Sequence, residues 1–380
     1  MLIKLDRKFW LGTATLVGST IGVGVYGVPF VFQKSGFLVG VLFLIGLGGL
    51  MLLTNLLYGE VVLRTNQRHQ LIGYSRLYLG GALSKINLFT FILGGYGALI
   101  GITIISSGFL SNIFSFLFHF SPTSWATFFV VVTSALILRG LRTVSRIDFF
   151  MMLIFGLIIL FIGIWGSGSI HYENFNFATK DFWFLPFGVI IFSMAGLPGI
   201  PLAREVLSGR ERSLRKALIL GTLIPLILYL FFAFVVVGIS GESTSPDAIS
   251  GLAWYLGPGI VFVGSALGFL TSFTIFLNLG TAMKRALQED FKFKSGWAWL
   301  LVVLPPYLLY LSGVRNFIDI ISLVGGLAVS VEMMILIFVY ANARKHGDRL
   351  PEYTIHIPLP LLYLMIAIFA FGAVYTLVFK

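Results

Sequence analysis

The chain has 380 residues, of which 58% are hydrophobic and only 11% are charged, and its net charge is +11. Soluble domains carry about 25% charged residues, so this chain has too little polar surface for a soluble fold. The composition predicts an all-α membrane protein and excludes the soluble α/β classes. The chain has no Cys, which excludes disulfides and thiolate metal sites.

Eleven segments are apolar and long enough to cross a bilayer, which takes about 20 residues. The first is interpreted as a span rather than a cleaved signal, because Gly, Thr and Pro interrupt it and no small-residue cleavage site follows a short apolar core. In chain order the predicted spans are 9–32, 37–63, 84–110, 124–141, 147–166, 183–204, 214–240, 254–285, 297–313, 315–340 and 359–379.

The positive charges predict the orientation of these spans. If the N-terminus is cytoplasmic, all of the 26 Lys and Arg residues except Lys34, Lys180, Arg315 and Lys380 fall in segments on the cytoplasmic side. Cytoplasmic loops of membrane proteins carry such an excess. We therefore expect the N-terminus inside and the C-terminus outside, in a cell inner (plasma) membrane whose anionic lipid attracts the basic loops.

Two of the spans contain residues that interrupt a helix. Span 9–32 includes the run GSTIGVGVYGVP at 18–29, and span 183–204 includes FSMAGLPGIP at 192–201. Interior Gly and Pro disfavour a continuous helix, and free backbone groups in a bilayer are tolerated only where they face protein, water or a ligand. We expect non-helical backbone at Gly22 and Gly196, near mid-membrane.

The two interrupted spans open two successive sets of five spans. Because the number per set is odd, the second set is inverted with respect to the first. The sequence thus predicts a first repeat at 1–166, a second, inverted repeat at 167–340, and a cytoplasmic loop with an eleventh helix at 341–380. Paired interruptions at corresponding places in inverted repeats point to the binding site of a secondary transporter.

A nucleotide-binding interpretation of span 9–32, the first helix, is excluded. The run from Gly22 to Gly27 matches the G-x-G-x-x-G fingerprint of dinucleotide sites. That fingerprint requires a preceding strand and an acidic residue about 20 positions later, whereas here it lies in a span and no acid follows before Glu60. We expect neither nucleotide nor nucleic acid as a partner.

The motif GSTIGVGV at 18–25 resembles helix 1 of the amino acid/polyamine/organocation superfamily, and FSMAG at 192–196 followed by IPLARE resembles its amino acid/auxin and aromatic amino acid permease branches. The resemblance implies the LeuT-type fold, with helices 1 and 6 unwound at mid-membrane around an amino acid. It places the carboxylate cradle at Ser19, Thr20, Gly22, Val23 and Gly24, and the ammonium site at Phe192, Ser193 and Ala195.

The resemblance also implies a sodium site between helix 1, which is span 9–32, and helix 8, which is span 254–285. In sodium-coupled members of this fold, two hydroxyls of helix 8 and backbone carbonyls bind the ion. The matching residues here are Gly18, Ile21, Gly268, Thr271 and Ser272. The other interpretation is that Thr271 and Ser272 hydrogen-bond to carbonyls of their own helix.

Two further residues are candidates by position. Tyr96 lies at the depth where the family places an aromatic residue over the substrate, or it is part of the core. Glu332 is an acid deep in span 315–340, and intramembrane acids are costly and often functional. It is a possible proton carrier, or else a structural partner of an Arg or of the backbone. Glu60 and Asp148 are expected to pair with basic loop residues.

The sequence therefore predicts a secondary active transporter of neutral, aromatic or branched, L-amino acids, with Na⁺ as the coupling ion and no other cofactor. The alternative is proton symport through Glu332. An intramembrane enzyme is disfavoured because HExxH, a Cys nucleophile and a mid-membrane His are absent from the sequence. A channel is disfavoured because no filter repeat or ring of charges is present. The oligomeric state is not predicted.

Overall fold

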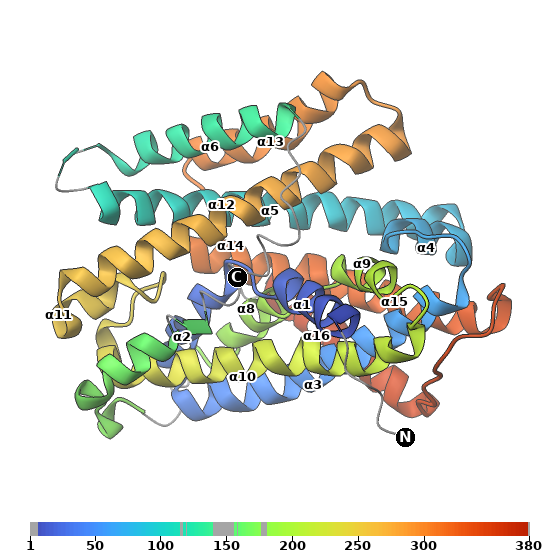
Figure 1. The fold of residues 1–380 in the computed structure, drawn as a ribbon, viewed down its shortest axis with the longest axis horizontal. Helices are drawn as coiled ribbons and strands as arrows, with labels where there is room; N and C mark the ends of the chain where they lie inside the picture. The colour runs from blue at the N-terminus through green and yellow to red at the C-terminus, as the bar shows by residue number, and fades with distance from the viewer. Residues whose placement is uncertain are drawn as a thin grey trace.

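The computed structural model describes residues 7–114, 117–118, 120–139, 156–157, 159–175 and 181–378. All the regular elements in these residues are helical (Figure 1). Six of the described helices are long and apolar enough to cross a membrane, and α1 and α2 together form a seventh such span with a bend of 57°. The prediction of an all-α membrane protein is confirmed.

The first half of the chain forms helix 1, which consists of α1 and α2, and the four helices that follow it. These are α1 (Arg7–Thr20), α2 (Gly24–Ser35), α3 (Phe37–Arg64), α4 (Leu71–Leu79), α5 (Gly81–Phe114) and α6 (Pro122–Leu138). Short 3₁₀ turns follow at Ser167–Ser169 and Tyr172–Asn174.

The second half begins with helix 6, which consists of α8 (Leu185–Ser193) and α9 (Gly199–Val206). After it come α10 (Leu214–Ser240), α11 (Ala253–Leu256), α12 (Pro258–Phe291), α13 (Ser295–Leu311), α14 (Phe317–Leu323), the π-helix η6 (Val324–Val329), α15 (Ser330–His346) and α16 (Leu359–Val378). Helix 10 is the continuous run of α14, η6 and α15. The remaining 3₁₀ turns are Glu211–Ser213, Gly241–Ser243 and Ser250–Leu252.

The predicted spans agree with these helices in place and order, with three differences. The eighth span begins at Pro258 rather than at 254, because Gly257 has a φ of 82° and separates it from α11. The helix α4 was not predicted, since it is a short helix within the loop 64–82. The fifth span, 147–166, lies largely outside the described residues, so the count of eleven spans stays a prediction.

The broken helices lie inside the molecule, between two sets of long helices. On one side α5 packs along α12, with α6 and α13 beyond them (Figure 1). On the other side α10 packs along both α1 and α3. Because both halves of helix 1 and helix 6 are covered in this way, their interrupted backbone faces protein rather than lipid, as the bilayer requires.

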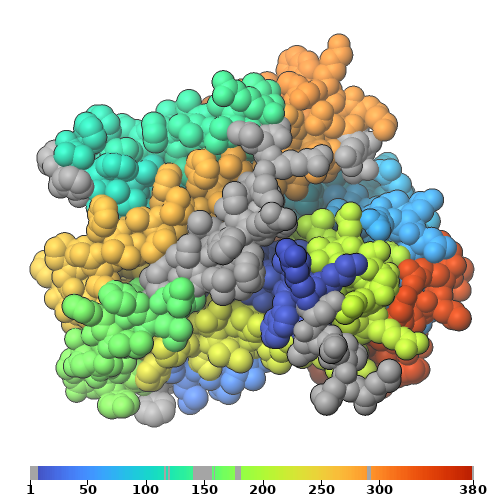
Figure 2. Space-filling view, in the orientation of Figure 1, coloured from blue at the N-terminus to red at the C-terminus, as the bar shows by residue number. Residues whose placement is uncertain are grey.

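The first half of helix 1, α1, lies against the second half of helix 6, α9. Figure 2 shows the dark blue α1 beside the yellow-green segment that contains α9. Lys8 Nζ donates to Ser208 O at 3.1 Å, and Gly12 packs directly against Leu207. The side chain of Leu207 is fully buried at this contact.

The loop after α15 is fastened to the end of α3. Glu60 is fully buried, pairs with Arg64 at 2.7 Å, and accepts a hydrogen bond from the Ile355 N–H at 2.7 Å. Tyr353 donates to Leu56 O at 2.8 Å. The expected pairing of Glu60 with a basic residue is confirmed, whereas Asp148 lies outside the described residues.

Candidate functional site

Helix 1 is interrupted over Ile21, Gly22 and Val23. The last α-helical backbone bond runs from Ile21 N–H to Val17 O at 2.8 Å, and the next turn begins with Val25 N–H to Gly22 O at 3.3 Å. Within the described residues, no backbone carbonyl accepts from the N–H groups of Val23 or Gly24. The break therefore leaves free donors at the start of α2, where the helix dipole favours an anion.

Helix 6 is interrupted over Met194–Pro198. Met194 N–H still bonds to Ile190 O at 2.9 Å, and regular helix resumes at Gly199. The expected non-helical backbone at Gly22 and Gly196 is confirmed. The end of α8 leaves carbonyl groups without helical partners, which suit a cation such as an ammonium group.

The two breaks are in direct contact. A Cβ atom on Gly24 would lie 2.5 Å from Ser193 Oγ and 2.9 Å from Phe192 Cδ1. On the other side of the crossing, a Cβ on Gly196 would overlap the Thr20 hydroxyl, and one on Gly199 would overlap Ser19 Oγ. Small residues at these points let the two interrupted backbones meet, which brings the free donors of helix 1 close to the free acceptors of helix 6.

The hydroxyl groups of the predicted substrate site, on Ser19, Thr20 and Ser193, bond to their own helices. Ser19 and Thr20 donate to Leu16 O at 2.9 and 3.0 Å, and Ser193 donates to Val189 O at 2.7 Å. Ser19 also reaches Gly196 O at 3.5 Å. What these residues offer a ligand is therefore mainly their backbone groups.

Tyr229 on α10 was missed in the sequence analysis, although it contacts both breaks. Its side chain is fully buried, and its hydroxyl lies 3.1 Å from Thr20 O and 3.0 Å from Ser193 O. The available signal was a Tyr in an otherwise apolar run, but nothing in the sequence connects it with residues so far along the chain.

Helix α12 passes alongside the break in helix 1. Ile275 Cδ1 lies 4.0 Å from the position of a Cβ on Gly22. Thr271, on the same helix, donates its hydroxyl proton to Leu267 O at 2.9 Å. Back-bonding, the alternative interpretation, thus applies to Thr271.

Ser272 does not follow that pattern. Its side chain is fully buried, and among the described residues its Oγ has no hydrogen-bond partner. A buried hydroxyl without a partner is uncommon in proteins and calls for an explanation such as a bound ion or water. The carbonyls of Gly18 and Ile21, at the end of α1, also accept no backbone bond in the described residues.

The other two candidates lie apart from the breaks. Tyr96 donates to Leu301 O on α13 at 2.6 Å, so its hydroxyl is held by α13 and not by helix 1 or helix 6. Glu332 is half-buried on α15, within helix 10.

Comparisons with known proteins agree with this arrangement. The profile of the tryptophan/tyrosine permease family matches residues 6–378. The chain is 24% identical over 370 residues to glutamine transporter 2 of Aliivibrio fischeri. That alignment covers 93% of this chain and 94% of the transporter. It is also 24% identical over 375 residues to tyrosine-specific transport system 2 of Haemophilus influenzae, in an alignment that covers 91% of both chains.

A solved structure shares the fold. The crystal structure of MhsT in complex with L-phenylalanine matches with a TM-score of 0.63 at 14% identity, over 97% of this chain and 98% of that chain. At this identity the match establishes the fold alone, and that fold is the LeuT type implied by the resemblance of helices 1 and 6.

Proposed function

The chain belongs to the tryptophan/tyrosine permease family, and we propose that it is a secondary active transporter of neutral L-amino acids that works by alternating access. It is an integral membrane protein and a transporter rather than an enzyme. The proposal rests on one observation above all, the contact between the interrupted backbones of helices 1 and 6 at Gly24 and Ser193. That contact brings free backbone donors of helix 1 and free backbone acceptors of helix 6 together, as the two charged groups of a zwitterion require.

The backbone groups at the breaks define the proposed substrate site. The N–H groups at Gly22, Val23 and Gly24, with Ser19 and Thr20 beside them, hold the carboxylate, because they lie at a helix N-terminus. The carbonyls at Phe192, Ser193 and Ala195 hold the ammonium. Tyr96 is bonded to α13 rather than to a break, so it would influence the substrate only indirectly.

The proposed substrate class is a neutral, aromatic or branched, amino acid. The relatives are named for glutamine and tyrosine, and the solved structure contains L-phenylalanine; all three have uncharged side chains. The breaks themselves carry no charged residue between Gly18 and Gly27 or between Phe192 and Pro201. A charged side chain would therefore have no counter-ion in these segments.

Sodium is the proposed coupling ion. Gly18 and Ile21 would supply carbonyls from the end of α1, and Gly268, Thr271 and Ser272 would supply oxygens from α12. The unpartnered Ser272 Oγ supports this assignment, since neutral oxygen ligands suit a weakly bound monovalent cation. The helix 1 residues of the site adjoin the substrate cradle, which gives the ion a direct route to influence substrate affinity.

Proton symport is the second candidate. The observation in its favour is that Glu332 is an acid within helix 10, on α15. A carboxylate at the centre of a span costs about 2.5–3.5 kcal/mol, so its presence there needs a reason. In this mechanism Thr271 and Ser272 would be structural only.

The remaining parts of the proposal concern topology. We propose two inverted repeats at 1–166 and 167–340 followed by 341–380, an N-terminus in the cytoplasm and a C-terminus outside, in the cell inner membrane. The basic loops would contact anionic lipid. Cysteine scanning is clean in this protein because it has no native Cys.

The experiment that tests the function is a ligand screen followed by uptake. Thermal stability of the purified protein is measured with each of the twenty amino acids, since a ligand that binds only the folded state raises the midpoint. Stabilising amino acids are then tested for uptake into proteoliposomes. Stabilisation and uptake only with neutral amino acids support the proposal; stabilisation only with charged ones, or none with any amino acid, contradicts it.

A further inference from the structure

The two breaks are joined by one side chain from a third helix. The Tyr229 hydroxyl on α10 lies within hydrogen-bond distance of Thr20 O, the last carbonyl of α1, and of Ser193 O, the last carbonyl of α8. In this way a single hydroxyl meets two backbone carbonyls that the missing helical turns leave free.

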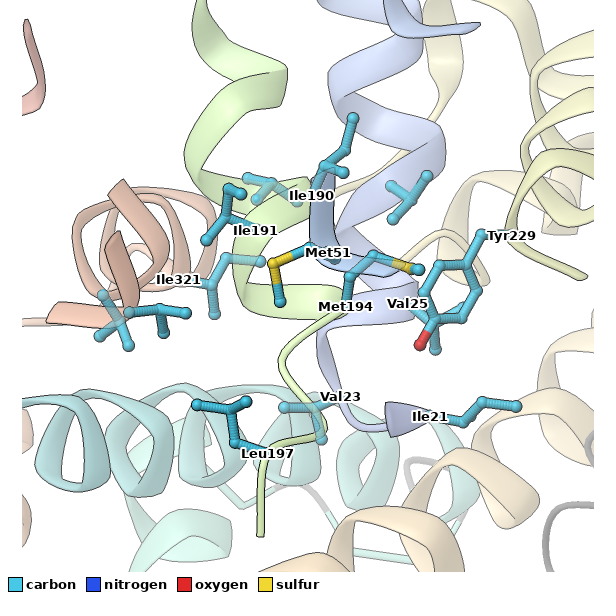
Figure 3. Packing of buried hydrophobic residues seen from close by; sticks show 14 of the residues in the cluster. Ile21, Val23, Val25, Met51, Ile190, Ile191, Met194, Leu197, Tyr229 and Ile321 are labelled. Carbon is cyan, nitrogen blue, oxygen red and sulfur yellow. The ribbon is translucent and has the colours of Figure 1, made fainter. Parts of the chain in front are cut away.

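Tyr229 reaches the breaks from α10. That helix packs on α1, α2 and α3, whereas α12 approaches the break in helix 1 at Gly22, through Ile275. In Figure 3, Tyr229 lies to the right of the interrupted backbones, near Met194 and Val25, and Leu197 lies at the lower left. Tyr229 thus contacts both breaks from a helix other than α12.

The chemistry of the hydroxyl makes this contact sensitive to movement. Its one proton is shared between two carbonyls, and a buried carbonyl without a partner is costly in a protein interior. If the end of α1 moved relative to the end of α8, at least one of the two bonds would break. Fixing one of these ends therefore favours the bonded position of the other.

We propose that Tyr229 is the positioning residue that couples ion binding at helix 1 to substrate binding at helix 6. The inference rests on the proposed function, in which the end of α1 holds Na⁺ and the end of α8 holds the substrate ammonium. Tyr229 ties these two ends together, so that each ligand stabilises the site of the other. Coupling between two ligands is reciprocal, and the tie gives it a physical path.

The test removes only the hydroxyl. In the Tyr229→Phe variant the affinity for a neutral amino acid found in the screen, such as L-tyrosine, is measured with Na⁺ and with choline. We expect the factor by which Na⁺ tightens substrate binding to fall at least about fivefold, the lower end of typical couplings. Tyr340→Phe is the matched control, because Tyr340 is equally buried and its hydroxyl bonds to a single carbonyl, Ile355 O, at 2.7 Å.

A second measurement reports on helix 1 directly. Thr13 on the inner half of α1 is buried, and Thr13→Cys supplies the only thiol in the chain. With Na⁺ and substrate present, the thiol should be protected in the otherwise unchanged protein and should react with a water-soluble maleimide in the Tyr229→Phe background.

The outcomes separate the two proposals. If Tyr229→Phe keeps the sodium effect on substrate affinity and leaves the thiol protected, the coupling role of Tyr229 is wrong. If the parent protein shows no sodium effect at all, the sodium part of the proposed function is wrong. The thiol experiment, with substrate alone, then decides whether Tyr229 holds the end of α1.

Discussion

Gly188 on α8 and Gly325 in the π-helix of helix 10 meet backbone to backbone. A Cβ on Gly325 would overlap the carbonyl of Gly188 and lie 2.7 Å from Phe192 N, and a Cβ on Gly188 would overlap the carbonyl of Ser322. At this crossing α8, the first half of helix 6, therefore has no side-chain layer between itself and helix 10. Close helix crossings in membranes are built from small residues in this way.

This crossing predicts a steep cost for a single methyl group. Gly325→Ala should destabilise the protein by about 1–3 kcal/mol through overpacking, because the atoms that a Cβ would meet are backbone. Gly94→Ala is the control, since its Cβ would meet Ala328 at an ordinary contact distance of 3.5 Å. Thermal unfolding in detergent compares the two, and equal midpoints would contradict the described crossing.

A second prediction concerns the glycines of helix 1. Gly24→Ala should lower uptake about tenfold or more, the effect of about 1.4 kcal/mol, because its Cβ would meet Ser193 and Phe192 at the crossing. Gly22→Ala should be milder, since its Cβ would meet only Ile275 at 4.0 Å. Gly22→Leu, with a much larger side chain, should abolish uptake and leave a folded protein. The reverse order of the two Ala variants would contradict the geometry.

A third prediction separates the two roles considered for Ser272. If its unpartnered hydroxyl were merely buried, Ser272→Ala would be neutral or slightly stabilising, because no hydrogen bond is lost. As a sodium ligand, the same change should raise the Na⁺ concentration needed for half-maximal uptake at least about fivefold without lowering stability. Sodium titrations of uptake and thermal unfolding distinguish these results.

A fourth prediction compares a buried ion pair with an exposed one. Glu60→Gln should destabilise the protein by about 3 kcal/mol, because it removes the fully buried carboxylate that pairs with Arg64 and leaves the Arg64 charge unpaired. Arg68→Ala breaks the pair with Glu205, at 3.2 Å, whose side chains are 58% and 59% exposed. That change should cost at most about 1 kcal/mol. Similar losses in thermal midpoint would contradict the burial described for Glu60.

The sequence could predict the broken helices because Gly and Pro act locally. The clusters around Gly22 and Gly196 interrupt a helix wherever it packs, and both breaks are confirmed. The contact partners of the breaks could not be predicted in this way. Tyr229 lies on another helix, and the periodicity of Leu214–Ser240 does not show which of its residues faces a break.

Tyr96 illustrates a second limit. Its depth along α5 follows from residue count, but the direction of its side chain depends on how α5 is rotated by its neighbours. The structure turns the Tyr96 hydroxyl toward Leu301 O, while Gly97 and Gly101 on the same helix face helix 10. Depth was thus predictable, and the facing helix was not.

The most direct test of the account is uptake into proteoliposomes with Na⁺ replaced by choline, first at fixed pH and then across a pH gradient. The account predicts uptake of a neutral amino acid that requires Na⁺, that is lost in Thr271→Val, and that persists in Glu332→Gln. Uptake that ignores Na⁺ and follows the pH gradient, with Thr271→Val active and Glu332→Gln inactive, would contradict it in favour of proton symport.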